Sequence, residues 1–415
     1  MTTTSPRHKN DADPLYGWVI VGAAAVLLGA AVGFSTNTIS VFIKPLAAEF
    51  GWQRGSLSLI YSAGVIGLAL GGIVTGWAAD RSTARRIVLL GVVVLGGCLV
   101  LVARANALWQ FYTVFFVAGF LGGGAIMVPL LANVGNWFRV NVGLALGCAT
   151  AGQALGQGAV PYGAALLICA TSWRDALTIM GVLAWAVLIP LALLIRQPPV
   201  AAASAMPSNQ PAEEDAQAIP LPPTLVTAWL SSAVIFCCVC MSVPLMHLVP
   251  LAQDRGIALD DAASVLFVVL FAAVFGRICF GKLADLIGPL RAYWLASCWQ
   301  TVLVFFFVQL DSLTVLYAFA FVYGFGYAGV MTGIIVCVRV MTPLAQRATA
   351  LGVVTLFAWV GHGIGGYQGG IFFDLTGNYT VSYANAALAG VINLIIVAAL
   401  YVTITRRRAA SVVVG

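Results

Sequence analysis

Apolar runs of about 20 residues recur from one end of this sequence to the other, and they constrain its fold more than any other feature. Hydrophobic residues make up 61% of the 415 residues and charged residues only 8%, which no water-soluble domain tolerates. In hydrocarbon, helices satisfy their backbone hydrogen bonds within one segment. The sequence therefore predicts an all-α membrane protein with twelve transmembrane helices, at 17–41, 55–78, 87–103, 108–132, 143–168, 175–196, 224–249, 262–284, 290–308, 313–337, 348–372 and 382–405.

The lysines and arginines are divided unevenly between the predicted loops. One side of the membrane carries fourteen of them, and the opposite side carries Lys44, Arg54, Arg104, Arg174 and Arg255. Basic residues accumulate on the cytoplasmic side of membrane proteins, so we predict that both termini are cytoplasmic. The same asymmetry accounts for the net charge of +6, and we expect no nucleic-acid partner.

The sequence lacks the motifs that carry enzyme chemistry. It has no G-x-x-x-x-G-K-[ST] phosphate loop, and its nine cysteines fall inside predicted helices or, for Cys169, at a helix end, without the spacing of a zinc site. The spans also lack the carboxylates from which acid-base or nucleophilic constellations are built. We therefore expect no metal and no cofactor, disfavour an enzyme or a sensor, and expect gradients to supply the energy for any transport.

The chain contains an internal repeat with an offset of 205 residues. PLAAEFG at 45–51 aligns with PLAQDRG at 250–256, and GWAAD at 76–80 aligns with GKLAD at 281–285. Parallel repeats place a site near the midplane where the halves meet, and they suit alternating access. We predict a monomer with a cytoplasmic tail (1–16), a six-helix bundle (17–196), a cytoplasmic linker (197–223), a second pseudo-symmetric six-helix bundle (224–405) and a cytoplasmic tail (406–415).

Two loops carry the signature of a known family. They are Gly76-x-x-x-Asp80-Arg81-x-x-x-Arg85-Arg86 and its second copy, Gly281-x-x-x-Asp285-x-x-Gly288-x-x-Arg291. With them the whole chain resembles the major facilitator superfamily, although Thr83 stands where a glycine is usual. The resemblance implies the major facilitator fold, and it implies gating loops that engage a neighbouring helix end in only one conformation, through Asp80, Arg81, Arg85, Asp285 and Arg291.

Other stretches resemble the monocarboxylate transporters and oxalate-formate exchangers of that superfamily. They are YGWVIV at 16–21, SVFIKPLAAEFGWQRGSLS at 40–58, NWFRVNVGLALGCATAG at 136–152 and FGRICFGKLAD at 275–285. In these relatives an arginine eight residues before the loop aspartate binds the substrate carboxylate, and Arg277 stands eight residues before Asp285. Two proton-relay positions of the eukaryotic members differ here, because Ala273 replaces an aspartate and Asn37 replaces a lysine.

Arg277 is a permanent cation inside a predicted span, where an unpaired charge is costly. All fourteen acidic residues fall in tails, loops or span ends, so none is left to pair with it inside the membrane. A guanidinium can grip a substrate carboxylate through two parallel hydrogen bonds, and this is one interpretation of Arg277. In the other, the side chain snorkels to lipid headgroups or caps carbonyls of a neighbouring helix.

Two histidines of the spans bear on the transport path. The repeat aligns His362 with Gln157, and we expect this polar pair to face the central cavity. Because histidine titrates near neutrality, His362 is also the candidate proton carrier, and the alternative is a helix-to-helix hydrogen bond. His247 lies near the outer end of the seventh span, where we expect a solvated or interfacial role.

Aromatic residues and one amide complete the candidate site. Tyr323 and Tyr327 are four residues apart on one helix face, and with Asn37 they can complete a carboxylate site or simply pack. Trp359 is expected to supply an apolar wall that suits an organic anion.

The sequence thus predicts a secondary active transporter for a small organic monocarboxylate such as lactate or pyruvate. We expect it to act by alternating access and proton-linked symport in a bacterial inner membrane, with the organic anion, the proton and the lipid bilayer as its partners. The alternative is an organic-anion exchanger or efflux permease of the same fold.

Overall fold

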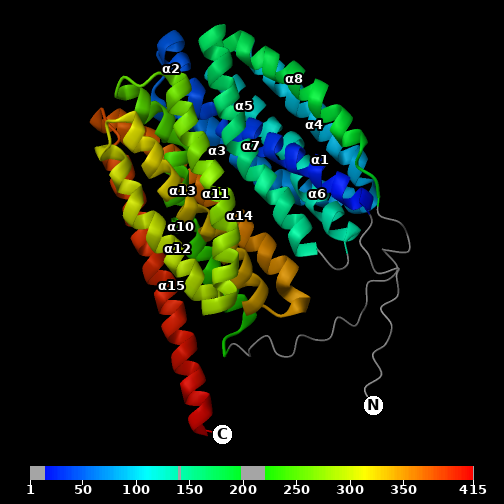
Figure 1. The fold of residues 1–415 in the computed structure, drawn as a ribbon, viewed down its shortest axis with the longest axis vertical. Helices are drawn as coiled ribbons and strands as arrows, with labels where there is room; N and C mark the ends of the chain where they lie inside the picture. The colour runs from blue at the N-terminus through cyan, green and yellow to red at the C-terminus, as the bar shows by residue number, and fades with distance from the viewer. Residues whose placement is uncertain (1–14, 139–141, 198–219, 415) are drawn as a thin grey trace.

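The described part of the chain folds into two bundles of long helices that lie side by side (Figure 1). The computed structural model describes residues 15–138, 142–197 and 220–414, apart from a few side chains that include the one of Asp80. The first bundle consists of α1 (Leu15–Val32), η1 (Gly33–Asn37), α2 (Ile39–Phe50), α3 (Arg54–Arg81), α4 (Ala84–Val102), α5 (Leu108–Val117), η2 (Ala118–Gly123), α6 (Gly124–Trp137), α7 (Val142–Ala170) and α8 (Trp173–Leu193). The second consists of α10 (Pro223–Asp254), α11 (Leu259–Ile287), α12 (Pro289–Val304), η3 (Phe305–Gln309), α13 (Leu313–Met341), α14 (Leu344–Thr376) and α15 (Thr380–Val414).

These helices form twelve membrane-length segments, because η1, η2 and η3 continue the helices on either side of them. Eleven of the segments are long and apolar enough to cross a membrane. The twelfth is α7, whose 29 residues include Gln153, Gln157 and Pro161. It packs between α1 and α11, so protein rather than lipid surrounds its polar side chains. The chain is thus a multi-pass membrane protein with twelve helices, as predicted.

The predicted repeat is visible in the helix bounds. Helices α11, α12 and α13 begin at Leu259, Pro289 and Leu313, each 205 residues after the start of α3, α4 and α5. Most of the predicted N-terminal tail and of the linker lies outside the described residues, and the predicted domain boundaries stay predictions. Helix α15 continues as one helix through residue 406, the predicted start of the last tail.

One pair of glycines related by the repeat shows why the halves have the same shape. A Cβ on Gly71 would lie 2.1 Å from the carbonyl oxygen of Phe120, and one on Gly276 would lie 1.9 Å from that of Phe325. Both glycines and both phenylalanines are related by the 205-residue offset. Only glycine lets the two helix backbones approach this closely, so the same contact is built into each half.

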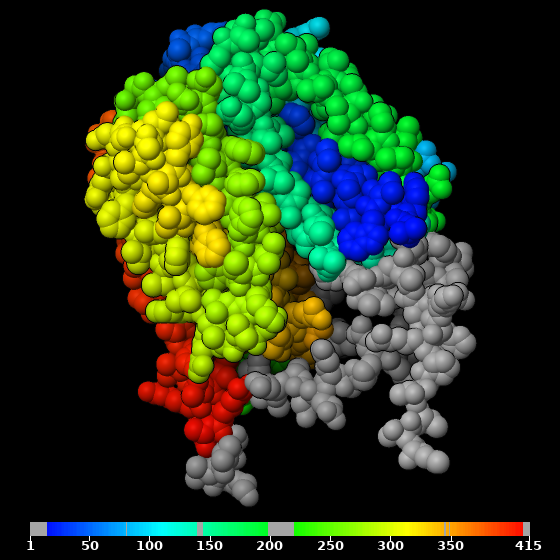
Figure 2. All heavy atoms as spheres, in the orientation of Figure 1, coloured from blue at the N-terminus to red at the C-terminus, as the bar shows by residue number. Residues whose placement is uncertain are grey.

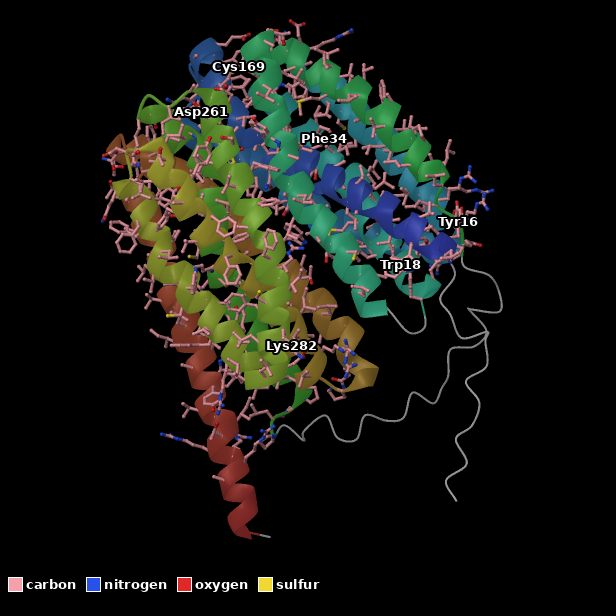
Figure 3. All side chains as sticks on the ribbon, in the orientation of Figure 1. Tyr16, Trp18, Phe34, Cys169, Asp261 and Lys282 are labelled. Atoms are coloured by element: carbon pink, nitrogen blue, oxygen red, sulfur yellow. The ribbon has the colours of Figure 1, made fainter. Side chains whose placement is uncertain are left out.

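Both described chain ends lie at one end of the molecule, which we call the terminal end, and the opposite end is the distal end (Figure 1). Figure 3 shows Tyr16, Trp18 and Lys282 at the terminal end and Asp261 and Cys169 at the distal end. The halves meet through two pseudo-symmetric helix pairs, α3 with α14 and α7 with α11. At the terminal end the start of α14 lies set back between the two halves (Figure 2).

Candidate substrate site between the halves

Arg277 reaches from one half to the other. It lies on α11, and its Nη1 donates a hydrogen bond of 2.7 Å to the carbonyl oxygen of Thr150 on α7. Among the described residues Nε is enclosed without a hydrogen-bond partner, and Nη2 also has none but keeps accessible surface. No carboxylate pairs with the guanidinium among the described residues. The carbonyl contact matches one of the two predicted roles, yet it leaves most of the charge and N–H groups of Arg277 available to an anion.

Tyr327 on α13 is a candidate residue that interacts with Arg277, since the two side chains are close enough for an electrostatic interaction. The tyrosine is 5% exposed, and its hydroxyl makes no hydrogen bond to a described residue. Tyr61 on α3 is in range of Tyr327 and packs against Gly366 of α14. Tyr327 therefore links Arg277 to a tyrosine of the first half that contacts α14.

Tyr323 lies one turn from Tyr327, with 6.1 Å between the ring centroids, but its surroundings differ. Its ring packs edge-on against Phe307, and its hydroxyl is enclosed without a hydrogen-bond partner. In this conformation the hydroxyl of Tyr323 thus belongs to the interior of the second half rather than to the surface between the halves.

His362 is buried on α14, and its Nδ1 lies 3.0 Å from the carbonyl oxygen of Ala358. Because a carbonyl only accepts, Nδ1 carries the proton in this hydrogen bond, and Nε2 of the neutral ring is then the acceptor. Nε2 has no hydrogen-bond partner in the described part of the chain and keeps accessible surface. The ring of Trp359 is 5.4 Å away and half-buried, so it covers one side of the imidazole.

Asn37 and Gln157 meet at the π-helical turn η1, where the extra residue per turn re-aims the side chains of the first span. Asn37 Nδ2 donates to the backbone carbonyl of Gln157 at 3.4 Å, and its Oδ1 accepts a hydrogen bond from Thr36. Among the described residues, no hydrogen bond or ring contact joins Gln157 to His362. Helix α7 packs on α1 and α11, whereas α14 packs on α3 and α10.

The gating-loop side chains that the structure describes do not reach the other half. Arg81 lies 3.9 Å over the ring of Trp77 on its own helix, and Arg85 and Asp285 are exposed. Arg291 donates to the hydroxyl of Tyr401 on α15, within the second half. The Asp80 side chain lies outside those that the structure describes. Within the described residues, no ion pair joins the halves at the terminal end.

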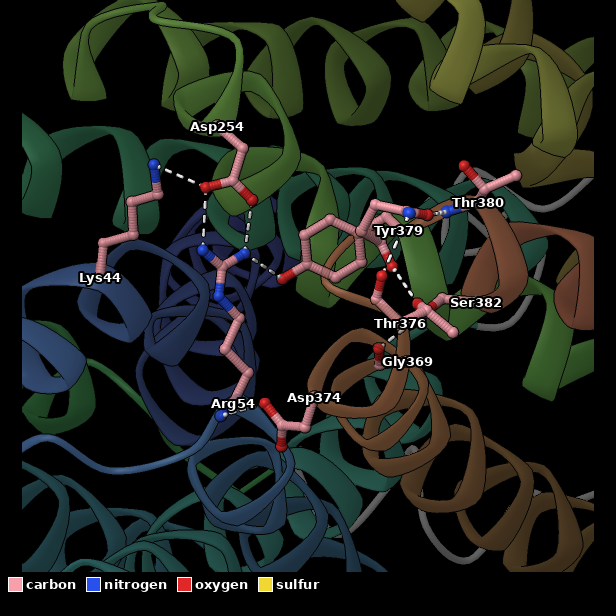
Figure 4. A network of polar contacts seen from close by, with 10 residues as sticks. Lys44, Arg54, Asp254, Gly369, Asp374, Thr376, Tyr379, Thr380 and Ser382 are labelled. Carbon is pink, nitrogen blue, oxygen red and sulfur yellow. Dashed lines mark hydrogen bonds and ion pairs between the residues drawn. The ribbon is translucent and has the colours of Figure 1, made fainter.

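The distal end is tied together by a network that we call the distal latch (Figure 4). It consists of Lys44, Arg54, Asp254, Asp374 and Tyr379. Asp254 of the second half pairs with Lys44 at 2.8 Å and with both terminal nitrogens of Arg54 at 2.6 and 2.8 Å. The Asp374 carboxylate accepts from the backbone N–H groups of Arg54 and Gly55 at the start of α3, at 2.9 and 2.6 Å. The halves are therefore closed on each other at this end.

The expected solvation of His247 is wrong. The side chain is fully buried, with Nε2 at 2.7 Å from the carbonyl oxygen of Gly366 and its ring 5.2 Å from that of Tyr379. The position of His247 near the end of its helix did not predict its burial, because α14 and the segment before α15 cover that face of α10. Sequence reasoning also missed Thr150 and the distal latch, and only the alignment of Glu49 with Asp254 through the repeat pointed towards the latch.

Two pseudo-symmetric six-helix halves, latched at one end and holding an unsatisfied cation between them, define a membrane transporter of the alternating-access class. The model of the Major Facilitator Superfamily matches residues 25–243 and 228–413, and the chain belongs to this superfamily. It is accordingly a transporter of a small molecule rather than an enzyme.

Similar proteins include an uncharacterised MFS-type transporter, YcxA, of Bacillus subtilis (strain 168), 24% identical over 92% of each chain. Monocarboxylate transporter 2 of Homo sapiens is 24% identical over 92% of this chain and 84% of its own. Among solved structures, an inward-facing bacterial homologue of the lysosomal transporter Spinster superposes with a TM-score of 0.71 at 17% identity, covering 95% of this chain and 98% of that one. The nucleoside transporter NupG gives a TM-score of 0.71 at 14% identity, covering 94% and 99%. These structures share the fold alone.

Proposed function

We propose that this protein is a secondary active transporter that moves a small organic monocarboxylate, of the size of lactate or pyruvate, by alternating access and proton-linked symport. It works as a monomer in a bacterial inner membrane with both termini in the cytoplasm. In that orientation the distal latch closes the outer face, and the structure is an inward-facing state.

The observation that carries the proposal is the state of Arg277. Its side chain is half-buried at the contact of the two halves, holds one backbone carbonyl, and has no carboxylate partner among the described residues. A cation in this environment is stabilised by an anion, and a planar carboxylate fits a guanidinium through two hydrogen bonds. The substrate supplies this anion, and the hydroxyl of Tyr327 supports it from the same half.

Two observations support a monocarboxylate rather than an inorganic anion. The half-buried ring of Trp359 beside His362 gives apolar surface to hold an organic chain. The similarity to monocarboxylate transporters also extends over 92% of this chain.

His362 carries the coupled proton. Its Nδ1–H is held by Ala358, so the accessible Nε2 is free to accept a proton from the path. Since no carboxylate lies in the membrane interior, a histidine replaces the aspartate relay of the eukaryotic relatives.

The test is uptake of labelled lactate, pyruvate, acetate, oxalate and aromatic acids into proteoliposomes, with and without an inward proton gradient. We expect one monocarboxylate to accumulate with the gradient. Arg277→Lys keeps the charge but loses the fork, and it should lower uptake about tenfold or more. The matched control is Arg104→Lys at the exposed distal surface, which should transport like the parent. If Arg277→Lys folds, inserts and transports as well as the parent, the substrate-binding role of Arg277 is wrong.

Exchange of organic anions is the second candidate, and the absence of an interior carboxylate favours it. If the protein is a symporter, its His362→Gln variant should lose the dependence of uptake on the proton gradient. It should still exchange internal for external substrate. If the parent protein requires internal substrate and ignores the gradient, the protein is an exchanger.

A further inference from the structure

Two adjoining cavities lie on the flank of the second half at the terminal end, between α12 and α15, two helices that pack against each other. One has a volume of about 390 Å³ and the other about 340 Å³. They share four lining residues, Ile287, Leu290, Arg291 and Tyr401, so they form one continuous hollow. This hollow is separate from the interface with the first half and takes no part in the transport site described above.

The cavity nearer the end of the molecule carries cationic and hydroxyl groups among apolar side chains. Its wall includes Arg291, Arg408 and the hydroxyl residues Tyr401 and Thr405, and none of its lining residues is acidic. The guanidinium of Arg291 is fixed by Tyr401, whose hydroxyl accepts from Nε at 3.0 Å and from Nη2 at 2.5 Å. These bonds use two of its five N–H groups, so Nη1 and the rest of Nη2 remain available to an anion.

The backbone adds to the positive potential of this cavity. Gly288, with φ of 90°, ends α11, and α12 starts at once with Pro289. The first N–H groups of α12, those of Leu290 and Arg291, have no acceptor within the helix, and the helix dipole places positive charge there. Both residues line the cavity.

The second cavity is apolar and opens on the membrane-facing surface. Its wall adds Trp294, Leu295, Val397, Ala398 and Val402, and three of these are large apolar side chains that are 38–43% exposed. On a helix pair of a membrane protein such side chains contact lipid tails, and tryptophan is typical of the boundary with the headgroups. A ligand that fills both cavities needs an anionic head at the end of the molecule and a hydrocarbon chain towards its middle.

We propose that this hollow binds an anionic phospholipid, with the phosphate at Arg291 and the start of α12, and one acyl chain along α15 in the apolar cavity. The hydroxyl of Tyr401 orients the guanidinium, and the run Arg406 to Arg408 on the extension of α15 attracts the anionic leaflet (Figure 1). Free phosphate would satisfy only the cationic part, whereas a lipid satisfies both.

The experiment is native mass spectrometry of the full chain in detergent with dioleoyl-phosphatidylglycerol, dioleoyl-phosphatidylcholine or inorganic phosphate. We expect one phosphatidylglycerol retained in preference to phosphatidylcholine, and no competition from inorganic phosphate at equal concentration. Arg291→Gln should weaken retention about tenfold. Ala398→Trp, which fills the apolar cavity and leaves every charge in place, should weaken it as well.

The matched control is Arg86→Gln, because Arg86 is the repeat equivalent of Arg291 and is likewise exposed at the start of its helix. It removes the same charge and should retain lipid like the parent, and melting temperatures report whether each variant is folded. Unchanged retention in folded Arg291→Gln, equal retention of phosphatidylcholine, or displacement by inorganic phosphate each overturns the lipid site. If Arg291→Gln does not fold, Ala398→Trp alone decides, since unchanged retention there removes the acyl-chain cavity from the site.

Discussion

At the scale of single residues, two adjacent positions of α11 have different requirements, one for close packing and one for a partner of its charge. Gly276 is pressed against the backbone of α13, and the next residue is Arg277, whose charge must be satisfied across the interface. Gly276→Ala places a methyl group too close to the carbonyl oxygen of Phe325, so the two helices must move apart. We therefore expect the free energy of unfolding to fall by about 1–3 kcal/mol. Gly281→Ala on the same helix is the control, because its Cβ would meet only the methyl of Thr332 at 3.8 Å. Thermal unfolding in detergent measures both, and equal melting temperatures for the two variants would show that the helices separate without cost.

At the scale of helices, the two halves use equivalent acidic positions differently. Asp254 ends α10 and pairs with Lys44 and Arg54 of the other half, whereas Glu49, its repeat equivalent near the end of α2, pairs with Arg174 of its own half at 2.8 Å. Asp254→Asn should therefore loosen the contact of α2 and α3 with the end of α10, with amide exchange at the start of α3 about tenfold faster. Glu49→Gln removes a comparable charge without touching the contact between halves and should leave that exchange unchanged. Equal protection in both variants would mean that Asp254 does not hold the distal end closed.

The positions of the helices were predictable from the sequence, whereas the contacts between helices were not. Hydrogen bonds within a helix depend on residues three or four apart, so the predicted span 143–168 corresponds to α7 at Val142–Ala170. The contact of Arg277 with Thr150 and the burial of His247 depend on which helix lies opposite, and no local pattern encodes that. The repeat carried part of this information, since it aligned helix starts and glycine contacts, but it predicts similarity within the halves rather than contacts between them.

At the scale of the whole molecule, transport requires the halves to separate at the distal end, where the structure holds them together. Gly55 of α3 faces Ile371 of α14, and a Cβ on Gly55 would lie 3.4 Å from the Cα of Ile371. That spacing suits a disulfide between Gly55→Cys and Ile371→Cys. We expect the oxidised double variant to lose transport while it still binds substrate from the terminal end, and a reductant should restore uptake. Each single variant controls for the substitutions and should be insensitive to oxidant, which also tests for interference from native cysteines such as the exposed Cys169. Thiol titration measures cross-linking, and a fully cross-linked protein that transports at the parental rate would mean that the substrate crosses without opening the distal latch.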